Sequence, residues 1–503
     1  MRRSTPALIA GAALAILPIS AAAAAPLTVG PLVQVSPTAS PFAGADADGP
    51  ACNGVPGSAQ TGRNFPGTEV EPQVSVNPAN TANLVGGWQQ DRWSDGGSNS
   101  NLAAYSTDAG TTWSLAATQP AHTRCTGGTA ANGGDYERAT DPWVSISPNG
   151  TAYYFSLGLD VAQDNNHAML VSRSTDSGRN WSAPAVLRRD TSPNVLNDKN
   201  SLTADRFDSR YAYAIWDRLE FPNDVAAKQA GEHAVGYRGP TWLARTTDGG
   251  ATWEPARQIY DPGEVNQTIG NLIVQTSDQT LVNGFDLIYN FKNSHKVRGY
   301  NVAAQRSTDR GVTWSNPVIV DKLQSRGITD PTTGAPVRTG DIIPSFAADP
   351  RNNTVYAVWQ DARSTGGARD QIAFAKSTDG GRTWSTSSYA INTVHSTQAF
   401  TATVNVLPDG TVGVLYYDFR NDDSGAPLVT STWLLHSLDG GQTWSETKVG
   451  ADFDQTGAPV ARGYFLGDYN GLGVSANGFY PLFTRSTGTP AAPAQNIYAT
   501  TAK

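Results

Sequence analysis

The sequence predicts an all-β protein, a single β-propeller built from four-stranded antiparallel blades. Three observations predict this fold class. A polar octet occurs six times along the 503 residues, and short strand-like runs with turn signals fill the spaces between the octets. No segment has the pattern of a convincing amphipathic helix. The 50 Gly, 18 Tyr and 13 Trp residues suit strands joined by many tight turns.

The octet STDGGRTW at residues 377–384 has five close variants elsewhere in the chain. Its Ser and Asp side chains can hydrogen-bond the amides of a tight turn, and its Gly supplies the positive φ that the turn requires. The Trp then begins the next strand and can pack between neighbouring sheets. We expect a structural role for the central aspartates, which are Asp108, Asp176, Asp248, Asp309, Asp379 and Asp439.

Six octets predict six blades, beginning near residues 71, 141, 200, 271, 343 and 401. After the last octet, the runs GDYNGLGVS, NGFYPLFTR and NIYATTA read as three further strands without an octet. Near the other terminus, PLVQVSP at 31–37 resembles the strands that follow octets. We therefore favour seven blades, with the last closed by this N-terminal strand, which would remove the open sheet edges. Six blades are the alternative.

The chain begins with two arginines, an apolar run and a string of small residues, which is typical of a cleaved secretory signal. We expect a signal peptide at 1–25, a closing strand and surface excursion at 26–69, and the propeller at 70–503. The expected product is a secreted, extracellular monomer. A net charge of −8 argues against nucleic acid or an anionic membrane as partner.

Cys52 and Cys125 are the two cysteines of the chain. In an exported protein a disulfide between them is the natural interpretation, and two unpaired thiols are the alternative. No Cys or His spacing indicates a metal site. The segments DADG at 46–49 and DVAQDNN at 160–166 could offer oxygen ligands to structural calcium, but solvated loops explain them as well. We expect no cofactor.

In such a ring, the starts of first strands and the ends of second strands share the face opposite the octets, where polar residues converge. Four second strands end in an Asp and an Arg, within WQQDR, WDR, WQDAR and YDFR. This repetition favours structural ion pairs between blades. The unrepeated polar residues are better site candidates: Glu69, Glu71, Asp95, Lys199, Glu264, Arg338, Arg462, Tyr464, Asp468 and Tyr469.

Position for position, the octets resemble the Asp-box, or bacterial neuraminidase repeat, S-x-D-x-G-x-T-W. Six matches in phase over about residues 70–450 resemble the sialidase-like superfamily. The resemblance implies that each box joins the third and fourth strands of a blade, at the rim away from the substrate. It also implies a nucleophilic Tyr at the start of the last blade, a place that Tyr469 holds in DYNGLGVS. An acid/base Asp is implied before the first box, which Asp95 matches, with Asp91 as second choice.

The chain departs from the sialidase pattern at two places. Val70-Glu71-Pro72 stands where an Arg-Ile-Pro motif supplies an arginine for the substrate carboxylate. Gln267 stands where a Tyr-activating Glu is implied, with Glu264 three residues earlier. Arg338, Arg420 and Arg462 remain as candidates for an anion clamp. Because Glu69 and Glu71 would repel a carboxylate, the sugar need not be sialic acid.

We therefore expect a secreted glycan-degrading enzyme, an exo-acting glycoside hydrolase of the sialidase superfamily. Its catalytic residues would be Asp95 as acid/base, Tyr469 as nucleophile or transition-state stabiliser, and Glu264. Its substrate-binding residues would be Glu69, Glu71, Arg338, Arg420, Arg462, Tyr464 and Asp468. One alternative is a polysaccharide lyase in which Lys199 and Arg338 neutralise a uronate. The other is a non-catalytic propeller that binds glycan or protein.

Overall fold

A computed structural model describes residues 24–42, 44, 52, 62–161, 166–221, 237–291, 297–386, 389–423, 425 and 427–503. The signal peptide expected at 1–25 lies almost wholly outside the described residues, as do the DADG segment and part of the surface excursion expected within 26–69. Within the described part, the helices are single 3₁₀ turns at Arg124–Thr126, Arg363–Thr365 and Gln455–Gly457. None of the helices described is long and apolar enough to cross a membrane.

The chain is all-β. Its strands follow one another in groups of four antiparallel strands, and single bridges join the first two groups and the last strands into one 12-stranded sheet. The first two sheets comprise β2 (Asn64–Val76), β3 (Leu84–Trp93), β4 (Ser98–Ser106) and β5 (Ser114–Leu115), then β6 (Arg138–Ile146), β7 (Ala152–Leu159), β8 (His167–Ser174) and β9 (Ala185–Asp190). The third and fourth comprise β10 (Val195–Ala204), β11 (Ala212–Glu220), β12 (Thr241–Thr246) and β13 (Arg257–Tyr260), then β14 (Gln267–Gln275), β15 (Leu281–Asn290), β16 (Val297–Ser307) and β17 (Val318–Leu323).

The later sheets follow the same order. They comprise β20 (Ser345–Ala348), β21 (Val355–Asp361), β22 (Gln371–Ser377) and β23 (Ser385–Thr386), then β24 (Ala399–Val406), β25 (Val412–Asp418), β26 (Val429–Ser437) and β27 (Ser445–Lys448), with β28 (Phe453–Asp454) beside β26. The last strands are β30 (Gly471–Ser475), β31 (Gly478–Ser486) and β32 (Gln495–Ala499). The N-terminal strand β1 (Val33–Gln34) pairs antiparallel with β32.

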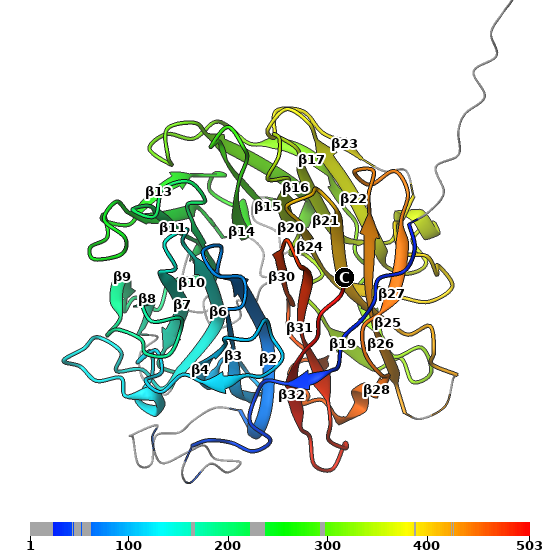
Figure 1. The fold of residues 1–503 in the computed structure, drawn as a ribbon, viewed down its shortest axis with the longest axis horizontal. Helices are drawn as coiled ribbons and strands as arrows, with labels where there is room; N and C mark the ends of the chain where they lie inside the picture. Colours follow the sequence, from blue (N-terminus) through cyan, green and yellow to red (C-terminus); the bar gives the residue numbers. More distant parts are fainter. Residues whose placement is uncertain are drawn as a thin grey trace, which may run out of the picture.

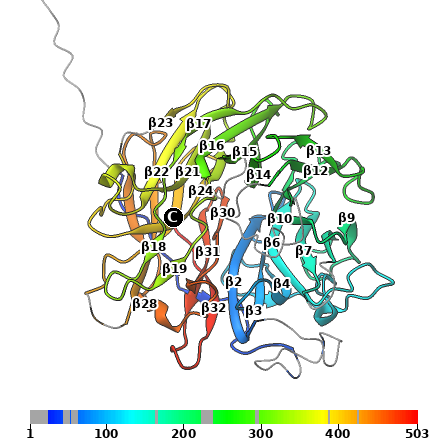
Figure 2. The ribbon, with the colours of Figure 1, turned by 180° about the vertical axis from the view of Figure 1, so that it is seen from behind.

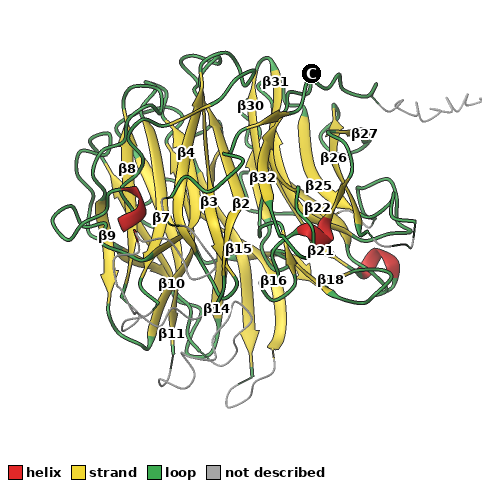
Figure 3. Ribbon diagram, turned by 90° about the horizontal axis from the view of Figure 1, so that it is seen from below, coloured by secondary structure: helices red, strands yellow, loops and turns green. Residues whose placement is uncertain are grey.

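The first strand of each sheet lies near the middle of the molecule. In sequence order β2, β6, β10, β14, β20, β24 and β30 each contact the next, and β30 also contacts β2. Figure 1 shows these strands around the centre, with β9, β13, β17, β23 and β27 at the periphery, and Figure 2 shows the same arrangement from behind. In Figure 3 the strands run side by side between two faces of the molecule. The hydrophobic clusters lie between successive sheets, as between β7 and β11.

Each octet forms the turn between the third and fourth strands of its sheet, as the sequence predicts. In the first, Ser106 Oγ donates to Asp108 Oδ1 (2.8 Å), and Thr112 donates its amide to Oδ1 (2.9 Å) and its hydroxyl to Oδ2 (2.6 Å). The octet Trp packs between neighbouring sheets; Trp181, for example, lies with residues of β3 and β7. The octets are therefore local turns that also supply intersheet core.

The turn after a first strand lies beside the octet of its own sheet. Gly249 N–H donates to Arg210 O (2.8 Å) and Gly380 N–H donates to Asn353 O (2.9 Å). The first strands therefore end at the side of the molecule that carries the octets, which we call the octet face. They begin at the opposite side, which we call the cap face.

Five first strands are bulged toward their beginning, where the register of the ladder shifts. At each bulge one residue adopts positive φ: Glu71 (56°), Asp141 (52°), Lys199 (44°), Gly270 (71°) and Thr401 (52°). A non-glycine residue in this region is uncommon, and such strain clusters at functional sites. The bulges re-aim their side chains at one level of the ring of first strands.

A small sheet covers the cap face. It contains β18 (Ile328–Thr329), β19 (Pro336–Arg338) and β29 (Tyr464–Phe465), which come from the linkers before β20 and β30. Strands β19 and β29 pair in parallel. We call these strands and the residues 466–468 that follow them the cap.

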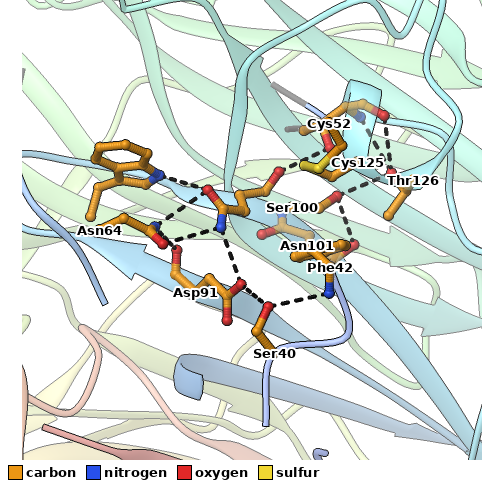
Figure 4. Close-up of a disulfide and its surroundings, with 12 residues drawn as sticks. Ser40, Phe42, Cys52, Asn64, Asp91, Ser100, Asn101, Cys125 and Thr126 are labelled. Carbon is orange, nitrogen blue, oxygen red and sulfur yellow. Dashed lines mark hydrogen bonds between the residues drawn. A yellow bond between two sulfur atoms is a disulfide. The ribbon is translucent and has the colours of Figure 1, made fainter. Parts of the chain in front are cut away.

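The N-terminal segment is tied to the body by side-chain contacts and a disulfide (Figure 4). Ser40 Oγ donates to Asp91 Oδ2 (2.5 Å), and Ser36 Oγ donates to Glu69 Oε2 (3.0 Å). Cys52 and Cys125 form a disulfide with a Cα–Cα distance of 4.9 Å.

Candidate functional site

The bulges and the cap bring seven polar side chains together beneath the cap face. Three come from the bulges, one from the end of β3, one from β19 and two from the residues before β30. We call this group the channel cluster: Glu71, Arg92, Asp141, Lys199, Arg338, Asp468 and Tyr469.

Asp468 is the centre of the channel cluster. Its Oδ2 accepts from Lys199 Nζ (2.8 Å) and Arg338 Nη2 (3.1 Å), while its Oδ1 makes no hydrogen bond with the described residues. The residue is 3% exposed. Burial alone would raise the pKa of Asp468, but the charges of Arg338 and Lys199 outweigh it and hold this pKa well below its ordinary value. Asp468 is therefore an ionised carboxylate with one uncommitted oxygen.

Glu71 is a second carboxyl in contact with Asp468 but with the opposite behaviour. Its Oε1 accepts from the backbone N–H of Asp468 (3.3 Å), and its Oε2 accepts from Gln89 Nε2. Burial, followed by the nearby charges of Asp141 and Asp468, raises the pKa of Glu71 well above its ordinary value. The site thus holds one carboxyl that keeps its proton beside one that loses it.

Asp141 adds a third carboxyl to the same group. Its Oδ1 accepts from Thr140 Oγ1 (2.8 Å), and its Oδ2 lies 3.8 Å from Lys199 Nζ without a hydrogen bond from the described residues. Lys199 therefore lies between two carboxylates from different segments. Since a buried charge is costly unless it is paired, this lysine is what lets both carboxylates remain close.

Tyr469 and Trp143 form the aromatic part of the site. Their ring centroids are 5.5 Å apart, and the Tyr469 hydroxyl donates to the carbonyl of Pro142 (3.3 Å). Burial raises the pKa of Tyr469 well above its ordinary value. The Tyr469 side chain is therefore a neutral phenol and a hydrogen-bond donor.

The arginines of the site are committed to protein partners. Arg92 Nη1 donates to Gln89 Oε1 (2.7 Å), and burial, with Arg338 nearby, lowers the pKa of Arg92 to about 10. The ring of Phe465 lies between Arg92 (5.0 Å) and Arg338 (4.1 Å). The clamp of Arg338, Arg420 and Arg462 that the sequence allowed does not form. Arg420 lies inside the sixth sheet, paired with Asp418 (2.5 Å) and stacked on Trp433 (3.8 Å), and Arg462 is exposed.

A cavity of about 340 Å³ follows the first strands from this group toward the octet face. At its inner end it is lined by Trp143, Lys199, Asp468 and Tyr469, and at the far end by Arg206 and Gln275. A volume of this size is at the lower end of the range for small-ligand sites. Among the described residues, no group of three or more His, Cys, Asp or Glu is placed to hold a metal ion.

Of the remaining sequence candidates, several have other roles. Asp95, the expected acid/base, pairs with Arg138 (2.8 Å), which is fully buried and stacks on Trp93 (4.0 Å). Glu264 is exposed in the turn before β14.

Glu69 is buried and accepts from Gln90 Nε2 (2.7 Å), Ser36 and Asn496, so it anchors the N-terminal segment. Tyr464 lies half-buried in β29 of the cap. The structure thus brings together Glu71, Lys199, Arg338, Asp468 and Tyr469 from the expected set.

Sequence reasoning gave too little weight to Asp141 and Arg92. A signal existed in the dipeptides Glu71-Pro72, Asp141-Pro142, Lys199-Asn200 and Gly270-Asn271, which occupy equivalent positions in successive first strands. Alignment of the first strands alone would have placed three charged side chains on one level.

Comparison with known proteins gives two family matches. Residues 241–455 match the BNR repeat-like domain, and residues 104–115 match the BNR/Asp-box repeat. No curated protein sequence matches the chain.

Among solved structures, a Hadza microbial sialidase, Hz136, is 16% identical, with 82% of this chain and 75% of that chain covered and a TM-score of 0.46. A Penicillium chrysogenum alpha-L-arabinanase complexed with arabinobiose is 11% identical (86% and 92% covered, TM-score 0.44). A polysaccharide lyase of family PL25, an ulvan lyase, is 10% identical (76% and 79% covered, TM-score 0.42). These likenesses are distant.

Proposed function

We propose a function from the premise that this chain is a BNR/Asp-box repeat protein with a sialidase-like fold. It is a glycan-degrading enzyme, a glycoside hydrolase whose reacting groups are those of the channel cluster. The observation that carries the proposal is a pair of neighbouring residues, Glu71 and Asp468, joined by the hydrogen bond from the Asp468 N–H to Glu71 Oε1, whose carboxyl pKa values are displaced in opposite directions. A glycosidase needs one carboxyl that donates a proton and another that stays ionised.

In this proposal Glu71 donates its proton to the glycosidic oxygen as the bond to the anomeric carbon breaks. A water molecule then bonds to the anomeric carbon and gives a proton back to Glu71. The Asp468 carboxylate stabilises the positive charge that develops on the sugar, through the Oδ1 atom, which accepts no hydrogen bond from the described residues. Tyr469 acts as a neutral donor that supports the transition state, and its ring and that of Trp143 offer apolar faces to a sugar. This assignment replaces Asp95 by Glu71 as the acid.

The charge distribution favours a neutral sugar. The cations Lys199 and Arg338 already bind Asp468, so a carboxylate on the substrate would have to compete with a protein carboxylate for them. The same commitment argues against a lyase, because these are the cations that would have to neutralise a uronate. A small, uncharged terminal sugar also suits a cavity of about 340 Å³.

We also propose a seven-bladed ring whose last sheet is completed by the N-terminal strand. The cyclic contacts of the first strands and the pairing of β1 with β32 support it. The disulfide between Cys52 and Cys125, together with the N-terminal sequence, supports export to an oxidising compartment.

The test is a product analysis on neutral, sialylated and uronic-acid glycans, read by mass spectrometry, with the wild type beside Glu71→Gln. Glu264→Gln is the matched control, since it makes the same change at an exposed carboxylate. We expect a saturated neutral monosaccharide from the wild type and from Glu264→Gln, and at least a 100-fold slower release from Glu71→Gln. An unsaturated product would identify a lyase, and binding without any product would identify a non-catalytic propeller.

A further inference from the structure

We infer that ligands reach the channel cluster from the octet face, through the channel and past Arg206, rather than from the cap face. The identity of the ligand as a glycan rests on the proposed function, but the route is a property of the channel itself. The inference reverses the expectation that the site opens at the face away from the octets.

The first observation is that the cap closes over the cluster. Arg338 of β19 bonds to Asp468, and Phe465 of β29 fills the space between Arg92 and Arg338. Glu71, Arg92 and Asp468 are 1%, 3% and 3% exposed.

Two glycines show how closely the cap backbone approaches its neighbours. A Cβ at Gly340 would lie 2.2 Å from the carbonyl oxygen of Asp468, and a Cβ at Gly467 would lie 2.7 Å from the backbone nitrogen of Glu71. Where these described backbones meet, they leave no room for a sugar between the cap and the bulges.

The second observation is the direction of the open space. The cavity meets the cluster at Lys199, Asp468 and Tyr469 and is lined from there by first-strand residues toward the octet face. It reaches Arg206, in the turn after β10, which lies beside the octet around Asp248. The same cavity therefore has the reacting carboxylate at one end and a cation at the other.

Arg206 has the features of a side chain at a channel mouth. More than a third of its surface is open to solvent, although protein surrounds it closely enough that burial lowers its pKa. Its guanidinium makes one long contact, from Nη1 to Gln275 O (3.4 Å), and the nearby Asp349 is already paired with Arg351 (2.9 Å). A charge at a narrow, low-dielectric entrance selects by sign, so Arg206 would admit neutral or anionic ligands and repel cationic ones.

The experiment places a reporter cysteine inside the channel and needs no glycan. Ala402 lines the cavity at the level of the bulges, and the described native cysteines are joined in a disulfide. In Ala402→Cys, the rate of modification is measured without reductant, using an anionic and a cationic methanethiosulfonate of similar size. We expect the anionic reagent to react faster.

Adding Arg206→Glu should reverse this preference, changing the ratio of the two rates by about tenfold or more. Arg206→Lys should keep it, which separates charge from local packing. Arg462→Glu is the matched control on the cap side, and it should leave the ratio unchanged because Arg462 is exposed away from the channel mouth.

A ratio that responds to Arg462→Glu and not to Arg206→Glu would overturn the inference, and so would a reporter that reacts with neither reagent while circular dichroism shows a folded protein. Either result would leave the product analysis of Glu71→Gln unaffected. A protein inactive on every glycan but with the expected rate ratio would instead contradict the function and keep the route.

Discussion

The octet turns and the channel cluster both depend on aspartates, exposed or half-buried in the octets and buried in the cluster, and the two regions satisfy them differently. In an octet, Asp248 is bonded within four residues, by Thr246 Oγ1 (2.8 Å), Thr252 N–H (2.9 Å) and Thr252 Oγ1 (2.6 Å). In the cluster, Asp468 is neutralised by Lys199 and Arg338, which are 269 and 130 residues away. Hydrogen bonds between neighbouring residues can recur in every octet along the chain. The long-range ion pairs of Asp468 occur once, and they keep this carboxylate ionised beside the protonated Glu71.

The largest difference between the two regions should appear in stability. Asp468→Asn leaves Lys199 and Arg338 close together in a buried site without their carboxylate, and we expect a loss of about 3–5 kcal/mol in the free energy of unfolding. Asp248→Asn removes local hydrogen bonds at the surface and should cost about 1 kcal/mol. Urea unfolding of both variants measures this comparison, and equal losses would contradict it.

The next effect concerns the pH dependence of catalysis. Glu71 has to be protonated to donate, so activity should fall as pH rises through its raised pKa, while Asp468 stays ionised down to strongly acidic pH. The rate should therefore decline on the alkaline side as Glu71 loses its proton. A pH profile of kcat/KM measures this, and Glu71→Asp should shift the alkaline limb without removing it.

The octets should respond to pH in the opposite sense. The pKa of Asp248, Asp309 and Asp379 is lowered to about 2 from an ordinary value of 3.8. For Asp248 the cause is the hydrogen bond from the Thr252 hydroxyl; for the other two, hydrogen bonds outweigh burial. Because the folded-state value is the lower one, their stabilisation is complete above about pH 4 and is lost as the pH falls toward 2. Thermal unfolding between pH 5 and 2 checks this, with Asp248→Asn as the variant that should show a shallower decline.

Substitution of Asp95 should have a smaller effect on stability, and it tests whether Asp95 or Glu71 is the acid. We expect Asp95→Asn to lower stability by about 1–2 kcal/mol, since Arg138 is fully buried but Asp95 is partly open to water. We expect the alkaline limb of the pH profile to remain in place. Loss of that limb in Asp95→Asn would restore Asp95 as the acid.

The smallest expected effect is at Thr401, a β-branched residue with φ of 52°. Glycine adopts this conformation without strain, so Thr401→Gly should change stability by less than about 1 kcal/mol, with strain relief offset by the greater freedom of unfolded glycine. The same substitution at Thr432, in the middle of β26, should be clearly destabilising. Urea midpoints of the two variants measure this difference.

The sequence predicted what depends on neighbouring residues. The octet turns, the all-β class and the Trp packing between sheets follow from side chains within a few positions of one another. It also predicted Tyr469 and Asp468 at the start of the last strands. It named Asp95 as the acid, and nothing in WQQDRWSDGG shows that a buried Arg138 from the next sheet pairs with that carboxylate.

The five bulges were not predicted, for a related physical reason. Positive φ at Glu71, Asp141 or Lys199 is set by the ladder of the neighbouring strand and by the cap, not by the residue's own preference. The arginine clamp failed similarly, since Arg420 finds Asp418 and Trp433 within its own sheet. Side chains that could have served a ligand were taken by partners that only the fold brings near.

The recurrence of a bulge at one level of the ring gives this fold a simple way to change its chemistry. Each bulged residue lies outside the regular pairing of its strand, so its side chain can be exchanged without breaking the ladder on either side. In this chain the five positions hold Glu71, Asp141, Lys199, Gly270 and Thr401. A different ligand would require different residues at these five positions, while the octets and the strands between them stayed the same.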